Sequence, residues 1–356
     1  MSIKSFFKEH TLLYVLLRKP YCFFLNFPKC IKVALEASYF PNLQRKTFIT
    51  RLLDLLIWVI KYNEVNVFYN LYSLDIKKHE DISRYYPYGV FLKKRDLLNK
   101  VGNPDSQIVI LRDKFLFYQF MRSLGYPVPK VKAIILHNQL IDEKMNNLNE
   151  KCLLEEKNFF VKAIDGECGN SVKRITDFKE FSDYKNQIKD VNCIIQDAVI
   201  QHEKMKLLNS EAVNTIRIIT VNKNGNVYLF GALIRIGTKL TGEKDNTSQG
   251  GVAVGVKDDG FLMEYGFRKP QFGGITYEHP DTHVIFKEFQ IPYYKEAVKL
   301  CCKVHKNFYN IRSIGWDVAI TPEGPVFIEG NDNWELQSIQ AIKHGLRKEV
   351  EEAFDE

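Results

Sequence analysis

The 356-residue chain lacks the sequence features of several protein classes. No apolar run reaches the roughly eighteen residues that a membrane-spanning helix needs. The apolar stretch at 11–17 is followed by Arg18, Lys19 and Pro20 without a small-residue cleavage site, which argues against a signal peptide. The seven cysteines are odd in number and form no C-x-x-C pair, so we expect neither a disulfide framework nor a zinc site. These absences favour a reduced, cytoplasmic compartment.

Most of the chain also lacks an excess of charge of one sign. The sequence has 50 Lys and Arg against 43 Asp and Glu, a net charge of +7. Residues 1–70 hold ten basic and four acidic side chains, so they account for +6 of that charge. A nucleic-acid-binding domain carries its basic residues on the folded body, and we therefore expect no nucleic-acid partner. The apolar content of 45% is that of a globular protein, and the length allows two or three domains.

The amino-terminal region is predicted to be helical and is rich in aromatic residues. Apolar residues recur at helical spacing in 12–17, 23–27 and 47–71, close to the basic pair Arg18 and Lys19. One interpretation is a helical cap packed on the main domain, which is favoured because core helices are commoner. The other is a basic amphipathic surface, within residues 1–40, that rests on the inner face of an anionic membrane.

The stretch 314–331, IGWDVAITPEGPVFIEGN, predicts a β-hairpin with three oxygen-bearing side chains on one face. A turn centred on Glu323 places Asp317 opposite Glu329, with Cβ atoms about 5 Å apart. Asn331 follows two residues later and points to the same side. Two carboxylates this close repel each other unless a cation lies between them, and oxygen ligands of this kind suit Mg²⁺. The alternative is an ordinary hairpin whose acidic side chains face water.

Two lysines and a glycine-containing loop precede the hairpin in the chain. Lys114 stands at the start of a predicted helix, where the helix dipole disfavours a cation unless an anion is bound. Lys162 lies near the end of a short strand at 158–163, and backbone N–H groups of the glycine loop that follows can cradle phosphates. The alternatives are a solvent-exposed lysine and a simple turn. The loop residues predicted to contact phosphate are Gly166, Glu167, Gly169, Asn170 and Ser171.

Two further segments suggest binding of a base and of an anion. An apolar strand at 191–199 that runs into polar residues suits a purine followed by a ribose, or else is an ordinary sheet edge. A hairpin at 215–236 contains Arg217 and Arg235, each between two isoleucines, so that both point away from one apolar layer. If the two arginines lie on the same face as the carboxylates, they indicate an anionic substrate. If they do not, they are ordinary solvent-exposed side chains.

Taken in this order, the motifs resemble those of the ATP-grasp superfamily. Over about residues 105–345 the chain looks like the sugar-transfer-associated ATP-grasp family, on the segments SEAVNTIRIIT, ALIRIG, DNTSQGGVAVGVKDDG, HPDT and IGWDVAITPEGPVFIEGN. The resemblance implies an α+β fold in which two subdomains hold ATP between them. It divides the chain into a mostly helical region (1–104), an amino-terminal ATP-grasp subdomain (105–205) and a carboxyl-terminal subdomain with the metal site (206–356).

The resemblance also implies the roles of the site residues. It implies that the α and β phosphates are bound by Lys114 and Lys162, and that adenine and ribose are contacted by Gln196, Val199 and His202. It also implies that one or two Mg²⁺ ions are held by Asp317, Glu329 and Asn331. The glycine loop would lie over the β and γ phosphates as a lid. Arg217 would stabilise the transferring phosphoryl group, while Arg235 and Asn246 would orient the acyl phosphate or its carboxylate precursor.

The function that this resemblance implies is an ATP- and Mg²⁺-dependent carboxylate-amine ligase. In such a ligase a carboxylate attacks the γ-phosphate, giving an acyl phosphate and ADP, and an amine then displaces phosphate. The expected partners are small-molecule or glycan carboxylates and amines, such as a sugar acid or amino sugar of a capsule or other cell-surface polysaccharide. Two alternatives are an ATP-grasp sugar kinase and a non-catalytic nucleotide-binding partner of a glycan assembly complex.

Overall fold

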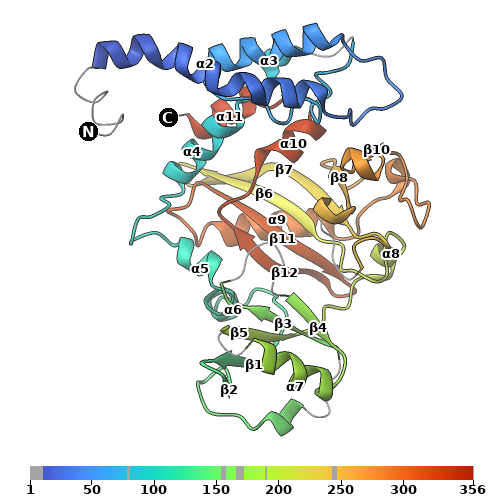
Figure 1. Ribbon diagram of the computed structural model, residues 1–356. Helices are drawn as coiled ribbons and strands as arrows, with labels where there is room; N and C mark the ends of the chain where they lie inside the picture. Colours follow the sequence, from blue (N-terminus) through green and yellow to red (C-terminus); the bar gives the residue numbers. More distant parts are fainter. Residues whose placement is uncertain are drawn as a thin grey trace.

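Two antiparallel sheets and their covering helices make up the computed structural model of the chain (Figure 1). The structure describes residues 11–77, 81–153, 158–165, 172–188, 191–242 and 247–355. This architecture confirms the predicted α+β class with an amino-terminal helical region.

The smaller sheet has five strands in the order β2-β1-β5-β3-β4, and together with α7 it is called the small lobe below. Side chains of β3 alternate between buried and half-buried, as expected of a strand with one face on a core. Phe159 of that strand packs edge-on against Phe181 of α7, with ring centroids 5.8 Å apart. The elements of the small lobe are β1 (Val131–Leu136), β2 (Gln139–Ile141), β3 (Phe159–Ala163), β4 (Val172–Ile175), α7 (Phe178–Gln187) and β5 (Cys193–Asp197).

The larger sheet has seven strands in the order β10-β9-β8-β7-β6-β11-β12 and forms the large lobe. Both of its faces are buried in apolar cores, because Ile216 and Ile218 belong to one core and Ile219 and Val221 to the other. Its strands are β6 (Ile216–Lys223), β7 (Asn226–Ile236), β8 (Val252–Val256), β9 (Leu262–Phe267), β10 (Ile275–Thr276), β11 (Ser313–Thr321) and β12 (Gly324–Asn331).

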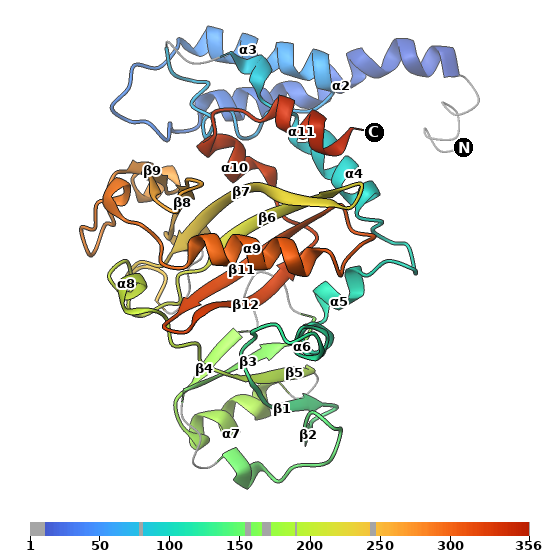
Figure 2. The same cartoon turned by 180° about the vertical axis from the view of Figure 1, so that it is seen from behind.

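Helices cover the large sheet on both faces (Figures 1 and 2). One face carries α9; the other carries α4, α10 and α11, with α2 and α3 as an outer layer beyond them. The predicted helical cap is therefore present. The remaining helices of the described chain are α2 (Thr11–Leu35), α3 (Phe48–Tyr62), α4 (Tyr88–Leu98), α5 (Ile108–Arg112), α6 (Lys114–Ser123), α8 (Glu203–Lys206), α9 (Tyr294–His305), α10 (Leu336–Ile342) and α11 (Arg347–Phe354).

Helix α6 packs on both lobes. Phe115 and Tyr118 lie in an apolar cluster with residues of the small-lobe sheet, such as Ile194. Phe117 and Met121, on an adjoining side of the helix, belong to the core between the large sheet and α9. A helix that is apolar on two sides is typical of one enclosed between two layers. Its amino terminus is thereby held at the boundary of the lobes.

A single buried glutamine joins the helical cap to the large lobe. The Gln340 carbonyl oxygen accepts from the Tyr86 N–H at 2.6 Å, and its amide donates to the Tyr86 carbonyl at 3.2 Å and to the Tyr72 hydroxyl at 2.9 Å. Gln340 is fully buried on α10. Both polar groups of the side chain therefore satisfy groups that water does not reach.

We predict that Gln340→Ala lowers the free energy of unfolding by about 3 kcal/mol, because each buried backbone group left without a partner costs about 1–3 kcal/mol. Urea unfolding followed by circular dichroism measures the change. Gln337→Ala, on the same helix at a half-buried position where the side-chain amide donates to the exposed Glu335, is the matched control and should change stability by less than about 0.5 kcal/mol. Equal effects of the two substitutions would contradict the structural role given to Gln340.

Candidate active site

The predicted pair of carboxylates is formed through a β-bulge. The β11–β12 hairpin turns at Pro322–Glu323, and continuation of its regular pairing would place Asp317 opposite Ile328. The register shifts by one residue after Val318, and Asp317 pairs with Glu329 instead. The centre of the turn thus lies between Pro322 and Glu323, half a residue before the predicted centre at Glu323. The bulge compensates for this difference, so that Asp317 still pairs with Glu329 as predicted.

Two arginines from neighbouring strands bind the Asp317 carboxylate. Arg217, directly opposite Asp317 on β6, donates to both of its oxygens, with Nη2 3.0 Å from Oδ2. Arg235 on β7 donates from Nη2 to Oδ2 at 2.7 Å. Asp317 is 1% exposed, so these ion pairs are largely shielded from water. The two arginines therefore share a face of the sheet with the carboxylates, which is one of the two arrangements that the sequence left open.

The pKa values of the two carboxyl groups are shifted in opposite directions. Burial, together with the Asp317 carboxylate, raises the pKa of Glu329. Burial also opposes ionisation of Asp317, but Arg217 and Arg235 outweigh it and hold the pKa of Asp317 well below its usual range. Burial and the Asp317 charge thus oppose ionisation of Glu329, and a metal cation placed between the two carboxyl groups would favour it.

The donor set fits Mg²⁺ and excludes softer metals. Asp317, Glu329 and Asn331 supply only oxygen ligands, which hard cations prefer. The Asn331 amide donates to Glu329 Oε1 at 3.2 Å, and a rotation of that amide would turn its carbonyl oxygen toward a cation instead. In the part of the chain that the structure describes, no three His, Cys, Asp or Glu residues could form a metal site by themselves. Two carboxylates completed by substrate phosphates match the usual mode of Mg²⁺ binding.

Lysines face these carboxylates from the other side. The Lys162 ammonium on β3 donates to Gln196 Oε1 at 3.2 Å. Burial lowers the pKa of Lys162 to about 8, with Glu329 acting against this shift and Lys114 adding to it. The two lysines and Glu329 are thus close enough to influence one another. Two ammonium groups in such proximity are stabilised by an anion placed between them.

The start of α6 determines where Lys114 lies. Asp113 caps the helix by accepting from the N–H groups of Phe115 and Leu116 at 2.9 and 2.8 Å. The Lys114 N–H itself donates to the Ile164 carbonyl, just beyond β3, at 3.0 Å. The backbone therefore ties this lysine to the strand that carries Lys162.

A cleft of about 1360 Å³ between the lobes brings most of the predicted site residues together. Its volume exceeds the roughly 300–1,000 Å³ of an ordinary small-molecule site, which leaves room for a nucleotide and a second substrate. The predicted residues that line it are Lys114, Lys162, Gln196, Val199, Arg217, Arg235, Asp317, Glu329 and Asn331.

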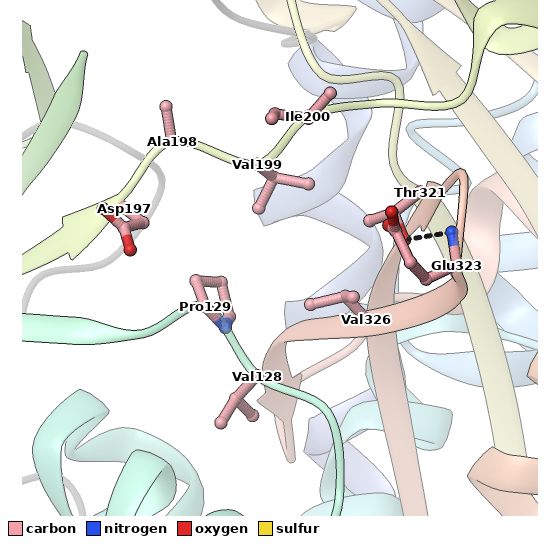
Figure 3. A pocket seen from close by; sticks show the side chains of 9 residues that line it. All are labelled: Val128, Pro129, Asp197, Ala198, Val199, Ile200, Thr321, Glu323 and Val326. Carbon is pink, nitrogen blue, oxygen red and sulfur yellow. Dashed lines mark hydrogen bonds between the residues drawn. The ribbon is translucent and has the colours of Figure 1, made fainter. Parts of the chain in front are cut away.

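A smaller cavity of about 230 Å³ adjoins the cleft where the chain passes between the lobes (Figure 3). Val199 and Pro129 belong to the two connecting segments and line both spaces, whereas Val326 comes from β12. The connections are fixed to the large sheet, because the N–H of Phe327 donates to the Pro127 carbonyl at 2.9 Å. This end of the cleft is apolar and suits a planar base, as predicted for the strand at 191–199.

His202 is not brought to the cleft. The chain leaves the small-lobe sheet at Asp197, and His202 instead caps α8, where its Nδ1 accepts from the Lys204 N–H at 3.0 Å. Its own N–H donates to the Ile320 carbonyl at 2.8 Å. His202 is not among the residues that line the cleft, so the structure does not place it where the predicted ribose contact would be made. The other predicted site residues lie outside the described residues: Gly166, Glu167, Gly169, Asn170, Ser171 and Asn246.

Three cleft residues, Thr215, Arg112 and Asp332, were not predicted from the sequence. The Thr215 hydroxyl accepts from Arg235 Nη2 at 2.9 Å and so orients that arginine. Thr215 precedes Arg217 by two residues, and this spacing was the available signal. At the cleft wall, Arg112 binds both oxygens of Asp332, at 3.0 and 2.7 Å. Nothing local in the sequence connects residues so far apart in the chain.

Two lobes closing on a cleft, with lysines on one side and paired carboxylates on the other, define an ATP-grasp protein. Residues 93–354 match the sequence model of the sugar-transfer associated ATP-grasp family. The chain therefore belongs to that family, as the motifs predicted. No curated protein matched the chain.

Solved structures of ATP-grasp enzymes are distantly similar. The biotin carboxylase domain of Hydrogenobacter thermophilus 2-oxoglutarate carboxylase, solved with MgADP, ADP and bicarbonate, is 14% identical with a TM-score of 0.42 over 70% of this chain and 46% of that chain. An L-amino acid ligase from Bacillus licheniformis is 14% identical with a TM-score of 0.39, over 68% and 45% of the two chains. D-alanyl-alanine synthetase A from Vibrio cholerae is 11% identical with a TM-score of 0.40, over 67% and 60%. The chain spans about half the length of the first two, and these likenesses carry no argument about activity.

We predict that ADP affinity depends on the charge of Lys162. The ammonium is protonated below its pKa of about 8, so affinity should be highest below that pH and fall as the pH rises above it. Lys162→Met should weaken binding tenfold to a hundredfold at neutral pH, because a hydrogen bond to a charged group contributes about 1.5–3 kcal/mol. Isothermal titration with MgADP from neutral to alkaline pH measures both effects.

The matched control for this experiment is Lys173→Met on the adjacent strand β4, whose side chain pairs with Glu180 at 3.2 Å. It should leave the affinity and its pH dependence unchanged. If Lys162→Met retains the alkaline decrease in affinity, another group causes it and the role given to Lys162 is wrong.

Proposed function

We propose that the protein is an ATP- and Mg²⁺-dependent ligase that joins a carboxylate to an amine with formation of ADP and phosphate. The observation that carries the proposal is the pair of guanidinium groups, Arg217 and Arg235, at the cleft wall beside the carboxylates. The lysines on the opposite side suffice for nucleotide phosphates. A second pair of cations is explained by a second anion, and an organic carboxylate is the anion that a ligase activates.

In the proposed mechanism each group of residues has a separate task. Lys114 and Lys162 hold the α and β phosphates, and the apolar end of the cleft holds the base against Val199. A bound Mg²⁺ would neutralise phosphate charge at Asp317, Glu329 and Asn331. An oxygen of the substrate carboxylate then attacks the γ-phosphorus, the bond to ADP breaks, and the acyl phosphate forms.

The arginines act on the anions produced in these steps. Arg217 stabilises charge on the transferring phosphoryl group, and Arg235, together with Asn246, orients the acyl phosphate for attack by the amine. Phosphate leaves as the amide forms, and the amine loses its proton. Asp317 keeps both guanidinium groups on one face before the substrate arrives, so little reorganisation is needed when it binds.

The family description supports a sugar-related substrate, and we propose a sugar acid or amino sugar used in a cell-surface polysaccharide. A cytoplasmic location follows from this proposal, because ATP is consumed.

An isotope experiment tests the reaction class. A panel of uronic acids labelled with ¹⁸O in the carboxylate is incubated with ATP, Mg²⁺ and amino compounds, and the products are analysed by mass spectrometry. A ligase transfers one labelled oxygen to inorganic phosphate for each amide and each ADP formed. Phosphate retained on a sugar hydroxyl would show a kinase instead, and nucleotide binding without turnover of any pair would support a non-catalytic role.

We further predict that Arg235→Lys lowers kcat/KM for the carboxylate substrate by about a hundredfold, because removal of one preorganised donor typically costs a factor of about 10²–10³. The lysine keeps a positive charge beside Asp317 but loses the planar donor geometry. MgADP affinity should stay within about twofold of the wild-type value. Arg312→Lys, at a site where the guanidinium binds the Ala353 carbonyl at 3.2 Å, is the control. A variant with unchanged kcat/KM would exclude Arg235 from substrate binding.

A further inference from the structure

Helix α3 exposes an apolar stripe to solvent. Ile49, Leu53, Ile57 and Ile60 follow one another at intervals of four, four and three residues and therefore lie on one side of the helix. Their side chains are 52–68% exposed. The opposite side of α3 packs in the core beneath, where Trp58 is 4% exposed. Burial of that second side fixes the outward direction of the stripe.

Helix α2 has a similar exposed side. Phe24 is 74% exposed and Leu35 is 66% exposed, and Phe27 between them is also exposed. Cys30 and Val33 are buried in the same core as the inner side of α3. The cap interpretation of this region is thus correct for one side of each helix, and the other side is apolar without being covered by any described part of the chain.

The two helices form the outermost layer of the molecule at the end opposite the small lobe (Figures 1 and 2). Single exposed apolar side chains are common on soluble proteins, but stripes on two adjacent helices form a patch of the kind that marks an interaction site. The small lobe, α5 and α6 lie away from this end. A partner bound to α2 and α3 would therefore not cover the side of the molecule on which these elements lie.

Charge indicates what the partner is. Within its 25 residues α2 contains four cationic side chains and no acidic one. Lys29 and Lys32 are exposed, and they lie on the same helix as the exposed phenylalanines. Residues 1–70 account for +6 of the net charge of +7. Aromatic and aliphatic side chains combined with lysine and arginine, as in α2, are typical of helices that lie in the interface of an anionic bilayer.

We propose that α2 and α3 dock the protein on the surface of an anionic lipid bilayer. Of the helices in the described residues, none is long and apolar enough to cross a membrane. The apolar stripes enter the headgroup region, and the lysines interact with lipid phosphates. The proposal is independent of the reaction that the cleft performs.

Vesicle co-sedimentation of the full chain tests the proposal. The protein should bind vesicles made of equal parts phosphatidylcholine and phosphatidylglycerol, bind vesicles of phosphatidylcholine alone at least tenfold more weakly, and dissociate as salt is raised. Leu53→Glu with Ile57→Glu should reduce binding at least tenfold. Lys29→Gln with Lys32→Gln should reduce it by about tenfold or more, because each cation near an anionic surface contributes about fivefold.

Matched controls use residues of the same types elsewhere on the surface. Leu207→Glu, beside α8, and Lys295→Gln with Lys299→Gln, on α9, should bind like the wild type. Circular dichroism melting establishes that every variant is folded. Binding that is absent on anionic vesicles, or equal in all variants, overturns the proposal. The proposal is also overturned if analytical ultracentrifugation shows the wild type to be a dimer that does not bind vesicles, and if Leu53→Glu with Ile57→Glu dissociates this dimer.

Discussion

Charge balance around one buried carboxylate is the constraint on which the site depends. Asp317 is 1% exposed and accepts from two guanidinium groups, so its negative charge is maintained where burial alone would neutralise it. Burial and this charge together raise the pKa of Glu329. One side chain consequently organises both halves of the wall, the two arginines and the oxygen-bearing side chains.

The register of the strands determines where these charged groups lie. The bulge in β12 moves Glu329 by one position, and Gly330 then faces the opposite core, where a Cβ would lie 2.8 Å from Leu111 and 3.1 Å from Trp316. A glycine at this point lets α5 approach the sheet closely and bring Arg112 to the cleft wall. Position along the strand thus determines which side chains face the nucleotide space and which face the core.

Alternation and turn chemistry were enough to predict much of this site from the sequence. The common face of Arg217 and Arg235 follows from the period of two, and the Asp317–Glu329 pairing was correct although the bulge was not foreseen. His202 does not line the cleft, because the chain leaves the small-lobe sheet at Asp197 and His202 caps α8. The sequence also could not show which sides of the amino-terminal helices pack, because both sides are apolar and only the folded neighbours decide between them.

Helix α6 has a consequence for motion of the two lobes. Since it packs on both sheets, opening of the cleft must slide one lobe along the helix or rotate it about the helix axis. Lys162 moves with the small lobe and Glu329 with the large one, whereas Lys114 lies next to the axis itself. Because the Lys114 N–H is bonded to the Ile164 carbonyl next to β3, such a motion would keep the two lysines together and part both of them from Glu329.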